Sequence, residues 1–148
     1  MKRIFIGAGI VVLLLAICAV FLIRFGNILD ISSQEFVDIN MENFFSTFSK
    51  DDLVKISTVT LQNNLNGNDD NFVFSKLKQL GQFQKYEGSK GEANIAVQFT
   101  KDRLEITAFY VASAVYQHGT IQAEVRLIRT GAQWQIDALT FDSPIFEK

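Results

Sequence analysis

The segment RLEITAFYVASAVYQ, residues 103–117, decides the fold of this chain. Its side chains alternate with a period of two, which is typical of a β-strand, and at about 3.3 Å per residue the strand would extend about 50 Å. Most strands have only about five or six residues, so we expect this one to curve. Its second face is also apolar at Phe109, Val111 and Val115, which predicts that both surfaces are covered there or that a partner covers one. The first face comprises Leu104, Ile106, Ala108, Tyr110, Ala112, Ala114 and Tyr116.

The residues that follow predict two further strands joined by hairpins. His118-Gly119 lies where a two-residue hairpin turn belongs, and residues 121–127 then alternate again. Thr130-Gly131-Ala132 predicts a second turn, after which residues 134–138 alternate.

The residues that precede the long strand predict one or two strands more. Residues 93–99 alternate, and Lys101-Asp102 predicts a turn into the long strand. A weaker strand is predicted at Phe83–Tyr86, separated from the next by Gly88-Ser89-Lys90-Gly91. The sum is an antiparallel meander of four or five strands.

Residues 33–81 change to a helical period. Ser32-Ser33-Gln34-Glu35 has the spacing of a capping box and predicts a helix over residues 33–48. Ser49-Lys50-Asp51-Asp52 predicts a second, short helix, and a third is expected from Asp69 or Asp70 to Gly81. Helices followed by a curled sheet indicate an α+β domain with the helices packed on the concave side. The apolar helical positions are Val37, Met41, Phe44, Phe45, Phe48, Leu53, Ile56, Phe72, Val73, Leu77 and Leu80.

The N-terminal segment Ile4–Ile23 contains 20 consecutive residues without a charge, a proline or a strongly polar group. A helix of that length rises about 30 Å, the thickness of bilayer hydrocarbon, so the segment can span a membrane. Lys2 and Arg3 precede it and only Arg24 lies close behind it. This basic excess favours an N-terminus in the cytoplasm and export of the rest of the chain.

An uncut signal anchor, a cleaved signal peptide and a lipoprotein signal compete for this segment. Cleaved signal peptides have an apolar region of about 7 to 15 residues, whereas this one continues past Ala16-Ile17-Cys18-Ala19. Leu15-Ala16-Ile17-Cys18 resembles a bacterial lipobox, but Ile17 stands where a small residue is expected. We therefore expect an anchor at residues 1–26, in a bacterial inner membrane. An extracytoplasmic domain at residues 27–148 would then lie in the periplasm or outside the cell.

The composition of the part beyond residue 26 excludes several classes of function. All 16 acidic residues and 11 of the 14 basic residues lie there, so its net charge is about −5, without a basic run. This charge argues against nucleic-acid binding. Cys18 is the only cysteine, which excludes a disulfide or a thiolate metal site within the domain.

Catalytic and metal-binding motifs are absent from the sequence. His118 is the only histidine, so no histidine cluster can ligate a metal, and its place in a turn favours a solvated residue. We therefore predict no catalytic residue, no metal and no cofactor.

A family resemblance rests on four stretches. Tyr110–Tyr116 followed by His118-Gly119, and the closing Gly131–Ile136 and Phe141–Pro144, make the chain resemble the small cystatin-like or NTF2-like domains of bacterial membrane-anchored or exported proteins. The resemblance covers most of residues 33–146 and implies a cone of helices on a curved sheet. Such folds host enzymes, binding modules and secretion-system assembly domains alike, so no functional residue is transferred from them.

We expect a non-enzymatic binding or assembly module that meets a protein partner or a second copy of itself at the membrane. An alternative is capture of a small apolar ligand between helices and sheet, for which Tyr110, Tyr116 and Trp134 are the candidate residues. A third possibility is an isomerase- or hydratase-like enzyme. For that, Asp137 or Asp142 would have to converge with one of the tyrosines in a pocket.

Overall fold

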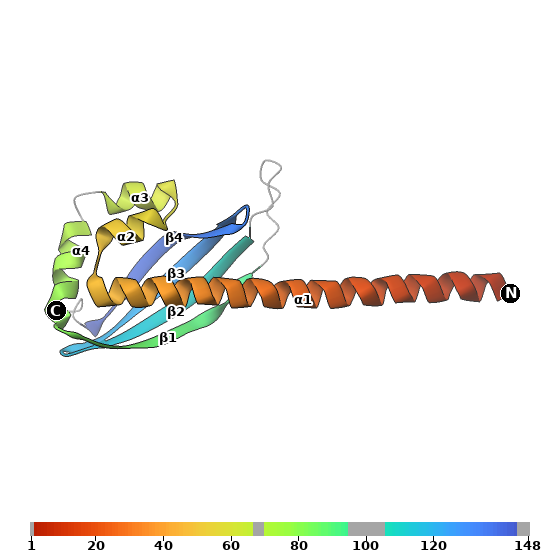
Figure 1. Cartoon of the computed structure of the whole chain (residues 1–148), viewed down its shortest axis with the longest axis horizontal. Coiled ribbons are helices and arrows are strands. Elements are labelled where there is room, and N and C mark those ends of the chain that lie inside the picture. The colour runs from red at the N-terminus through yellow and green to blue at the C-terminus, as the bar shows by residue number, and fades with distance from the viewer. Residues whose placement is uncertain (1, 67–69, 95–105, 145–148) are drawn as a thin grey trace.

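The computed structural model describes residues 2–66, 70–94 and 106–144. It is an α+β structure in which a long helix precedes three short helices and one antiparallel sheet of strand order β1-β2-β3-β4 (Figure 1). The elements are α1 (Lys2–Thr47), α2 (Lys50–Lys55), α3 (Val59–Leu65), α4 (Asp70–Leu77), the 3-10 turn η1 (Lys78–Leu80), β1 (Phe83–Asn94), β2 (Ile106–Tyr116), β3 (Gly119–Thr130) and β4 (Gln133–Asp142).

Helix α1 is continuous over 46 residues, so the prediction that a helix begins at residue 33 is wrong. The hydroxyls of the predicted capping box do not cap. The Ser33 Oγ donates to the carbonyl of Leu29 at 2.7 Å, within the helix. Serine can bond back to the preceding turn in this way, and no proline interrupts the helix upstream. The apolar N-terminal part of α1 therefore projects beyond the sheet as an extension of the same helix (Figure 1).

The C-terminal half of α1 packs on the inner face of the sheet. Its buried side chains recur three or four residues apart, which places them on one side of the helix. Phe44 is at the centre of this layer, 5.6 Å between ring centroids from Phe141 of β4 and 6.0 Å from Phe74 of α4. The buried apolar residues of α1 are Leu29, Val37, Met41, Phe44 and Phe45.

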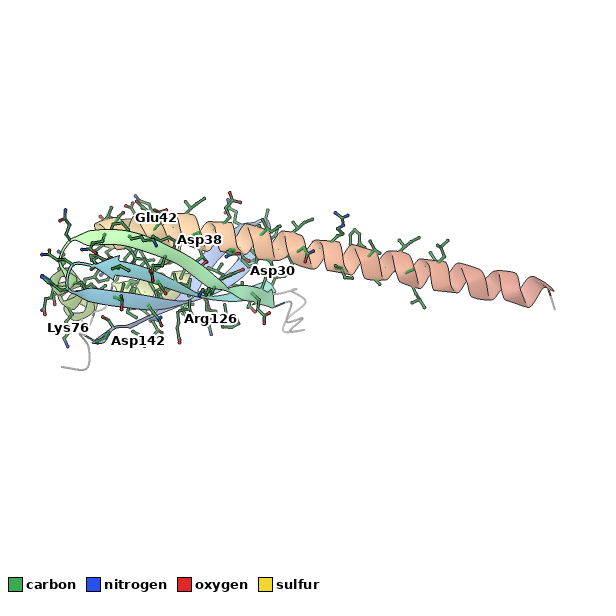
Figure 2. All side chains as sticks on the ribbon, turned by 90° about the horizontal axis from the view of Figure 1, so that it is seen from below. Asp30, Asp38, Glu42, Lys76, Arg126 and Asp142 are labelled. Atoms are coloured by element: carbon green, nitrogen blue, oxygen red, sulfur yellow. The ribbon has the colours of Figure 1, made fainter. Side chains whose placement is uncertain are left out.

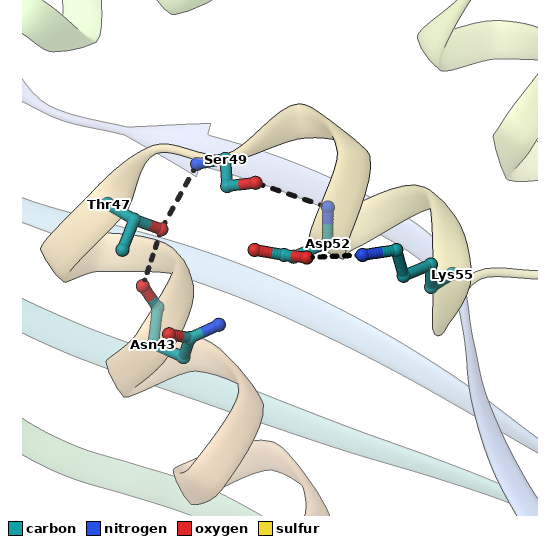
Figure 3. A network of polar contacts seen from close by, with 5 residues as sticks. All are labelled: Asn43, Thr47, Ser49, Asp52 and Lys55. Carbon is teal, nitrogen blue, oxygen red and sulfur yellow. Dashed lines mark hydrogen bonds and ion pairs between the residues drawn. The ribbon is translucent and has the colours of Figure 1, made fainter.

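The corner between α1 and α2 is closed by a polar network (Figure 3). The Thr47 hydroxyl donates to the Asn43 carbonyl at 2.9 Å and accepts the Ser49 N–H at 3.2 Å. The Ser49 hydroxyl accepts the N–H of Asp52 at 3.3 Å, which confirms the predicted start of the second helix. Helix α3, capped by the Thr58 hydroxyl, was not predicted.

The predicted third helix is confirmed as α4 and η1, which end at Gly81. The φ of +82° at Gly81 lies in the region that favours glycine, which explains a stop at this residue. The side chains of the predicted core positions Phe72 and Val73 lie outside the described residues.

Strand β1 runs unbroken through the four residues that were predicted to separate two strands, Gly88-Ser89-Lys90-Gly91. This prediction is wrong because Gly88, with a φ of +91°, accompanies a shift of register in the pairing with β2 and does not end the strand. The predicted strand positions Ile95, Val97 and Phe99, the turn at Lys101-Asp102 and Leu104 lie outside the described residues.

The two hairpins around β3 are confirmed, but the first turn is Gln117-His118, one residue earlier than predicted, because Gly119 already pairs with Tyr116. The second turn is Gly131-Ala132. The alternation predicted for the long strand is confirmed over the part described as β2, whose inner side chains are buried. Its outer face is different. Phe109 is 49% exposed and Val111 is 37% exposed, so the described part of the chain covers only one surface of β2.

Candidate functional site

Helix α1 and the inner face of the sheet are joined by the polar ends of aromatic side chains. The buried Tyr110 of β2 places its hydroxyl 2.8 Å from the Ser33 hydroxyl, and it donates to the carbonyl of Asp30 at 3.2 Å. Burying a tyrosine requires a partner for its hydroxyl, and α1 supplies two. Tyr110 therefore fixes one turn of α1 against the middle of the sheet.

Tyr116 and Trp134 bind α1 in the same way. The Tyr116 hydroxyl donates to the carbonyl of Phe45, and its ring stacks on Phe48 with centroids 5.4 Å apart. The Trp134 indole N–H donates to the Ser32 hydroxyl at 3.1 Å. The structure thus brings all three ligand-binding candidates to the inner layer, where each contacts α1.

Burial changes the pKa values of the two tyrosine hydroxyls. Loss of solvent raises the pKa of the Tyr116 hydroxyl well above its usual value. Burial also raises the pKa of Tyr110, with the hydrogen bond to Ser33 acting in the opposite direction. Both tyrosines therefore stay neutral donors near neutral pH, as their contacts with carbonyl oxygens require.

The outer edge of β1 is protected by carboxylates of α1. Asp30 accepts the N–H of Ala93 at 2.7 Å, and Asp38 accepts the N–H of Ser89 at 2.9 Å. Asp30 and Asp38 are eight helical residues apart, a rise of about 12 Å, and Ser89 and Ala93 are four strand residues apart, about 13 Å. The distance between the two carboxylates therefore matches the distance between the two N–H groups. Figure 2 labels both aspartates on α1 alongside β1. An edge strand with free N–H groups invites pairing with other chains, and α1 occupies two of those groups.

Sequence reasoning missed an acid–tyrosine pair at this edge. Asp38 also accepts the hydroxyl of Tyr86 at 2.8 Å, and burial followed by this bond raises the pKa of Tyr86. Gln34 donates to the carbonyl of Ser89 at 3.2 Å from the turn between the two aspartates. The signal was a polar repeat at residues 30, 34 and 38, which places three hydrogen-bonding side chains on one side of a helix.

The acids proposed for an enzyme do not bond to the candidate tyrosines. Asp137 accepts the guanidinium of Arg126 at 2.6 and 3.0 Å and the Thr58 hydroxyl at 3.1 Å. A shift of register in the β3–β4 pairing beside Arg126 places Asp137 there. Asp142 is exposed at the end of β4. Asp137 therefore orients the Arg126 side chain and links β4 to Thr58 at the start of α3.

The described residues contain no cluster of side chains that could bind a metal ion. Among residues 2–66, 70–94 and 106–144, no three His, Cys, Asp or Glu side chains are placed to hold a metal ion. His118 is exposed in its turn, with its Nδ1 3.3 Å from the carbonyl of Gln79.

The chain matches no protein-family model, no curated protein and no solved structure.

Surface hollows adjoin both faces of the sheet. One, of about 520 Å³, lies between α1, α2 and the β3–β4 hairpin, and Phe36, Ile39 and Trp134 contribute to its wall. Another, of about 450 Å³, lies on the outer face of the sheet, around Phe109 and Val111. It is lined across the sheet from Lys90 and Gly91 through Phe109 and Val111 to Ala138 and Thr140.

Charged residues surround the two exposed apolar side chains of β2. Phe109 pairs with Glu92 of β1 and Arg126 of β3, and Val111 pairs with Lys90 of β1 and Glu124 of β3. Directly paired residues of antiparallel strands share one face of the sheet. Figure 2 labels Arg126 on the side of the sheet away from α1. We call Phe109, Val111 and these four charged residues the outer patch.

Proposed function

We propose that this protein is a membrane-anchored, extracytoplasmic binding or assembly module of a bacterial inner membrane. The observation that carries the proposal is the continuity of α1, which joins an apolar segment to the core of the α+β domain. In the part of α1 whose side chains are described, one stretch is long and apolar enough to cross a membrane, and only 6% of it is buried in the protein.

The exposed N-terminal part of α1 needs an apolar surrounding. Leu15, Ile17 and Phe21 are each more than half exposed, and Phe21 stacks on Phe25 of the same helix. Contiguous apolar surface of this kind marks a protein or membrane contact, and lipid covers a single helix on all sides.

The anchor and the domain are separated by a very short distance. The uncharged run ends at Ile23, and the first buried residue of the core is Leu29, so five helical residues intervene and the rise from Ile23 to Leu29 is about 9 Å. Gly26 lies within this stretch and α1 remains helical through it. The domain would therefore sit at the headgroup layer with a defined orientation, which raises its effective concentration near a membrane-bound partner.

We also propose that the domain belongs among the cystatin-like or NTF2-like cones. The support is a helix packed along the inner face of a four-stranded antiparallel meander, together with the sequence stretches that resemble those families. Because the polar ends of Tyr110, Tyr116 and Trp134 bind α1, the outer side of the sheet is the surface we assign to partner binding.

The test of anchoring combines fractionation with labelling of the full chain. Thr130→Cys, in a Cys18→Ser background, places one thiol at the exposed end of β3, beside the β3–β4 turn. We expect the intact chain in carbonate-washed membranes, with this thiol modified by an impermeant maleimide added to whole cells with a permeabilised outer membrane. Cys18 alone is the matched control, because its thiol would lie in lipid.

Three results would contradict the proposal. They are recovery of the intact chain in the cytosolic supernatant, labelling of residue 130 only after lysis, and a mature polypeptide that begins after Ala16 or Cys18. If the chain is membrane-bound but captures no partner and is strictly monomeric, the proposed assembly role is wrong and the proposed anchor still holds.

A further inference from the structure

The outer patch is an unusual part of the sheet surface. Of the large apolar side chains exposed in the described ranges, only Phe109 and Val111 lie on the sheet. All others lie on α1 except Val59, at the start of α3. The two residues are next-but-one neighbours on β2, so their side chains leave the same face side by side.

The four charges of the outer patch alternate in sign around these two side chains. Beside Phe109 stand Glu92 on one flank and Arg126 on the other, and beside Val111 stand Lys90 and Glu124 on the same flanks. Each charge is therefore opposite in sign to its neighbour along its own strand and to its counterpart across β2.

This arrangement is complementary to itself. A second copy turned by 180° about an axis along β2 would lay the β1 flank of one chain over the β3 flank of the other. Glu92 then faces Arg126, and Lys90 faces Glu124, with each contact made twice by symmetry. Phe109 meets Phe109 and Val111 meets Val111 at the axis. We propose that the outer patch is the interface of a homodimer.

The existing bond of Arg126 leaves room for a second acid. Asp137 takes the Nε and Nη2 hydrogens of Arg126 on one oxygen atom, at 3.0 and 2.6 Å. A guanidinium has five N–H donors, so others remain for Glu92 of a second copy. The carboxylate of Asp137 also fixes the direction of the Arg126 side chain, which reduces the entropy lost on binding.

The area of the face is in the range of a specific interface. Four strands spaced about 4.8 Å apart and about 11 residues long cover at most about 700 Å² per copy, or about 1,400 Å² in all. Stable protein–protein interfaces bury about 1,200–2,000 Å². The apolar centre and charged rim also follow the usual order of such interfaces.

Two symmetry axes would pair opposite charges, one along β2 and one across the strands. The choice between them rests on the proposed membrane anchor. An axis across the strands would also pair opposite charges, with Glu92 over Lys90 and Arg126 over Glu124, but it would point the two α1 helices in opposite directions. The axis along β2 keeps both apolar segments at the same end of the dimer, because α1 crosses the strands obliquely and projects beyond one end of the sheet (Figure 1). Two copies in one bilayer therefore meet about the axis along β2.

Crosslinking of the full chain in membranes tests the axis. In a Cys18→Ser background, Phe109→Cys and Val111→Cys are each expected to form a covalent dimer with a short bismaleimide, because each residue faces itself. Val59→Cys, which is exposed on α3, is the matched control and is expected to stay monomeric. Crosslinking only when the 109 and 111 variants are mixed would indicate the other axis and overturn this dimer.

A charge exchange tests the contacts. Glu124→Lys places Lys90 opposite a lysine and is expected to weaken dimerisation in detergent micelles about tenfold, measured by analytical ultracentrifugation. Lys90→Glu is expected to do the same, and the double variant is expected to restore the dimer. About the other axis, the double variant would instead place like charges together twice. Failure of the double variant to recover would overturn the proposal.

The outcomes for the interface and the anchor are separable. A chain that stays in membranes but is monomeric, or that crosslinks from residue 109 only to a different protein, overturns the homodimer and leaves the anchor. A cytosolic chain that still crosslinks through residues 109 and 111 supports the interface and overturns the anchor.

Discussion

The two faces of β2 have the same apolar alternation and opposite surroundings. On the inner face, Tyr110 and Tyr116 are buried, and their hydroxyls bond to α1. On the outer face, Phe109 and Val111 lie between charged residues and remain exposed. The comparison teaches that a strand pattern identifies which residues share a face, whereas the number of covering layers decides which face becomes the core.

The largest expected difference between the faces is in packing. Phe44→Ala on the inner layer removes a ring that contacts Phe48, Phe74 and Phe141. We expect a loss of about 3–5 kcal/mol in the free energy of unfolding. Denaturant unfolding of the full chain in mild detergent measures it. A loss below that of a surface substitution such as Val59→Ala would show that α1 does not pack on the sheet.

The second-largest loss of stability is expected at the outer edge of β1, which the carboxylates of α1 protect. Asp38→Ala leaves the Tyr86 hydroxyl and the Ser89 N–H without their acceptor, so we expect a loss of about 2 kcal/mol. The exposed Glu42, one turn further along α1, is the matched control through Glu42→Ala. Equal losses for the two variants would show that the carboxylate bonds at the edge do not contribute.

Alkaline pH offers a third comparison, because the tyrosines bound to α1 have raised pKa values in the folded state. Below pH about 10, folded and unfolded chains hold the same phenolic protons and stability is constant. Above it, the unfolded chain loses protons first, so stability falls, by up to about 1.4 kcal/mol at pH 11 for Tyr116. Unfolding between pH 8 and 11 measures this slope.

The matched variant for this slope is Tyr116→Phe, which keeps the ring and removes the ionisable group. We expect a shallower alkaline slope on a slightly less stable protein. An unchanged slope would mean that Tyr116 titrates alike in the folded and unfolded chains.

The smallest effect is expected on the outer face. Phe109→Ser removes an exposed ring, so we expect the stability of the monomer to change by no more than about 0.5 kcal/mol. The measurement is made at low protein concentration, where association does not contribute. A loss comparable to that of Phe44→Ala would show that the outer face is covered within a single chain.

The strands and their turns could largely be predicted from the sequence because their signals are local. Alternation over β2 and β3 and glycine at 119 and 131 depend only on neighbouring residues. The Gly88–Gly91 stretch misled for the opposite reason. Its strand conformation is supported by a distant residue, because Asp38 of α1 bonds to the Ser89 N–H. A tertiary contact of this kind leaves no local pattern.

The helix start at residue 33 was mispredicted because a capping motif and a mid-helix serine have the same composition. Ser32 and Ser33 bond back to Leu29, and between the apolar run and these serines, over residues 24–31, Gly26 is the only weak helix breaker. The structure places Tyr110, Tyr116 and Trp134 on the inner face of the sheet, and their ligand-binding role stays a prediction. Their contact with α1 could not be anticipated without knowing that α1 covers that face.

The unbroken course of α1 across residues 23–29 has a geometric consequence. Each residue added to or removed from this stretch would swivel the domain by about 100° relative to the bilayer and change its height by about 1.5 Å. The number of residues between the apolar run and the core thus sets the direction in which the outer patch faces around the axis of α1. Seven added residues would bring the sheet back to within about 20° of its original direction, and eighteen added residues, five full turns, would restore it.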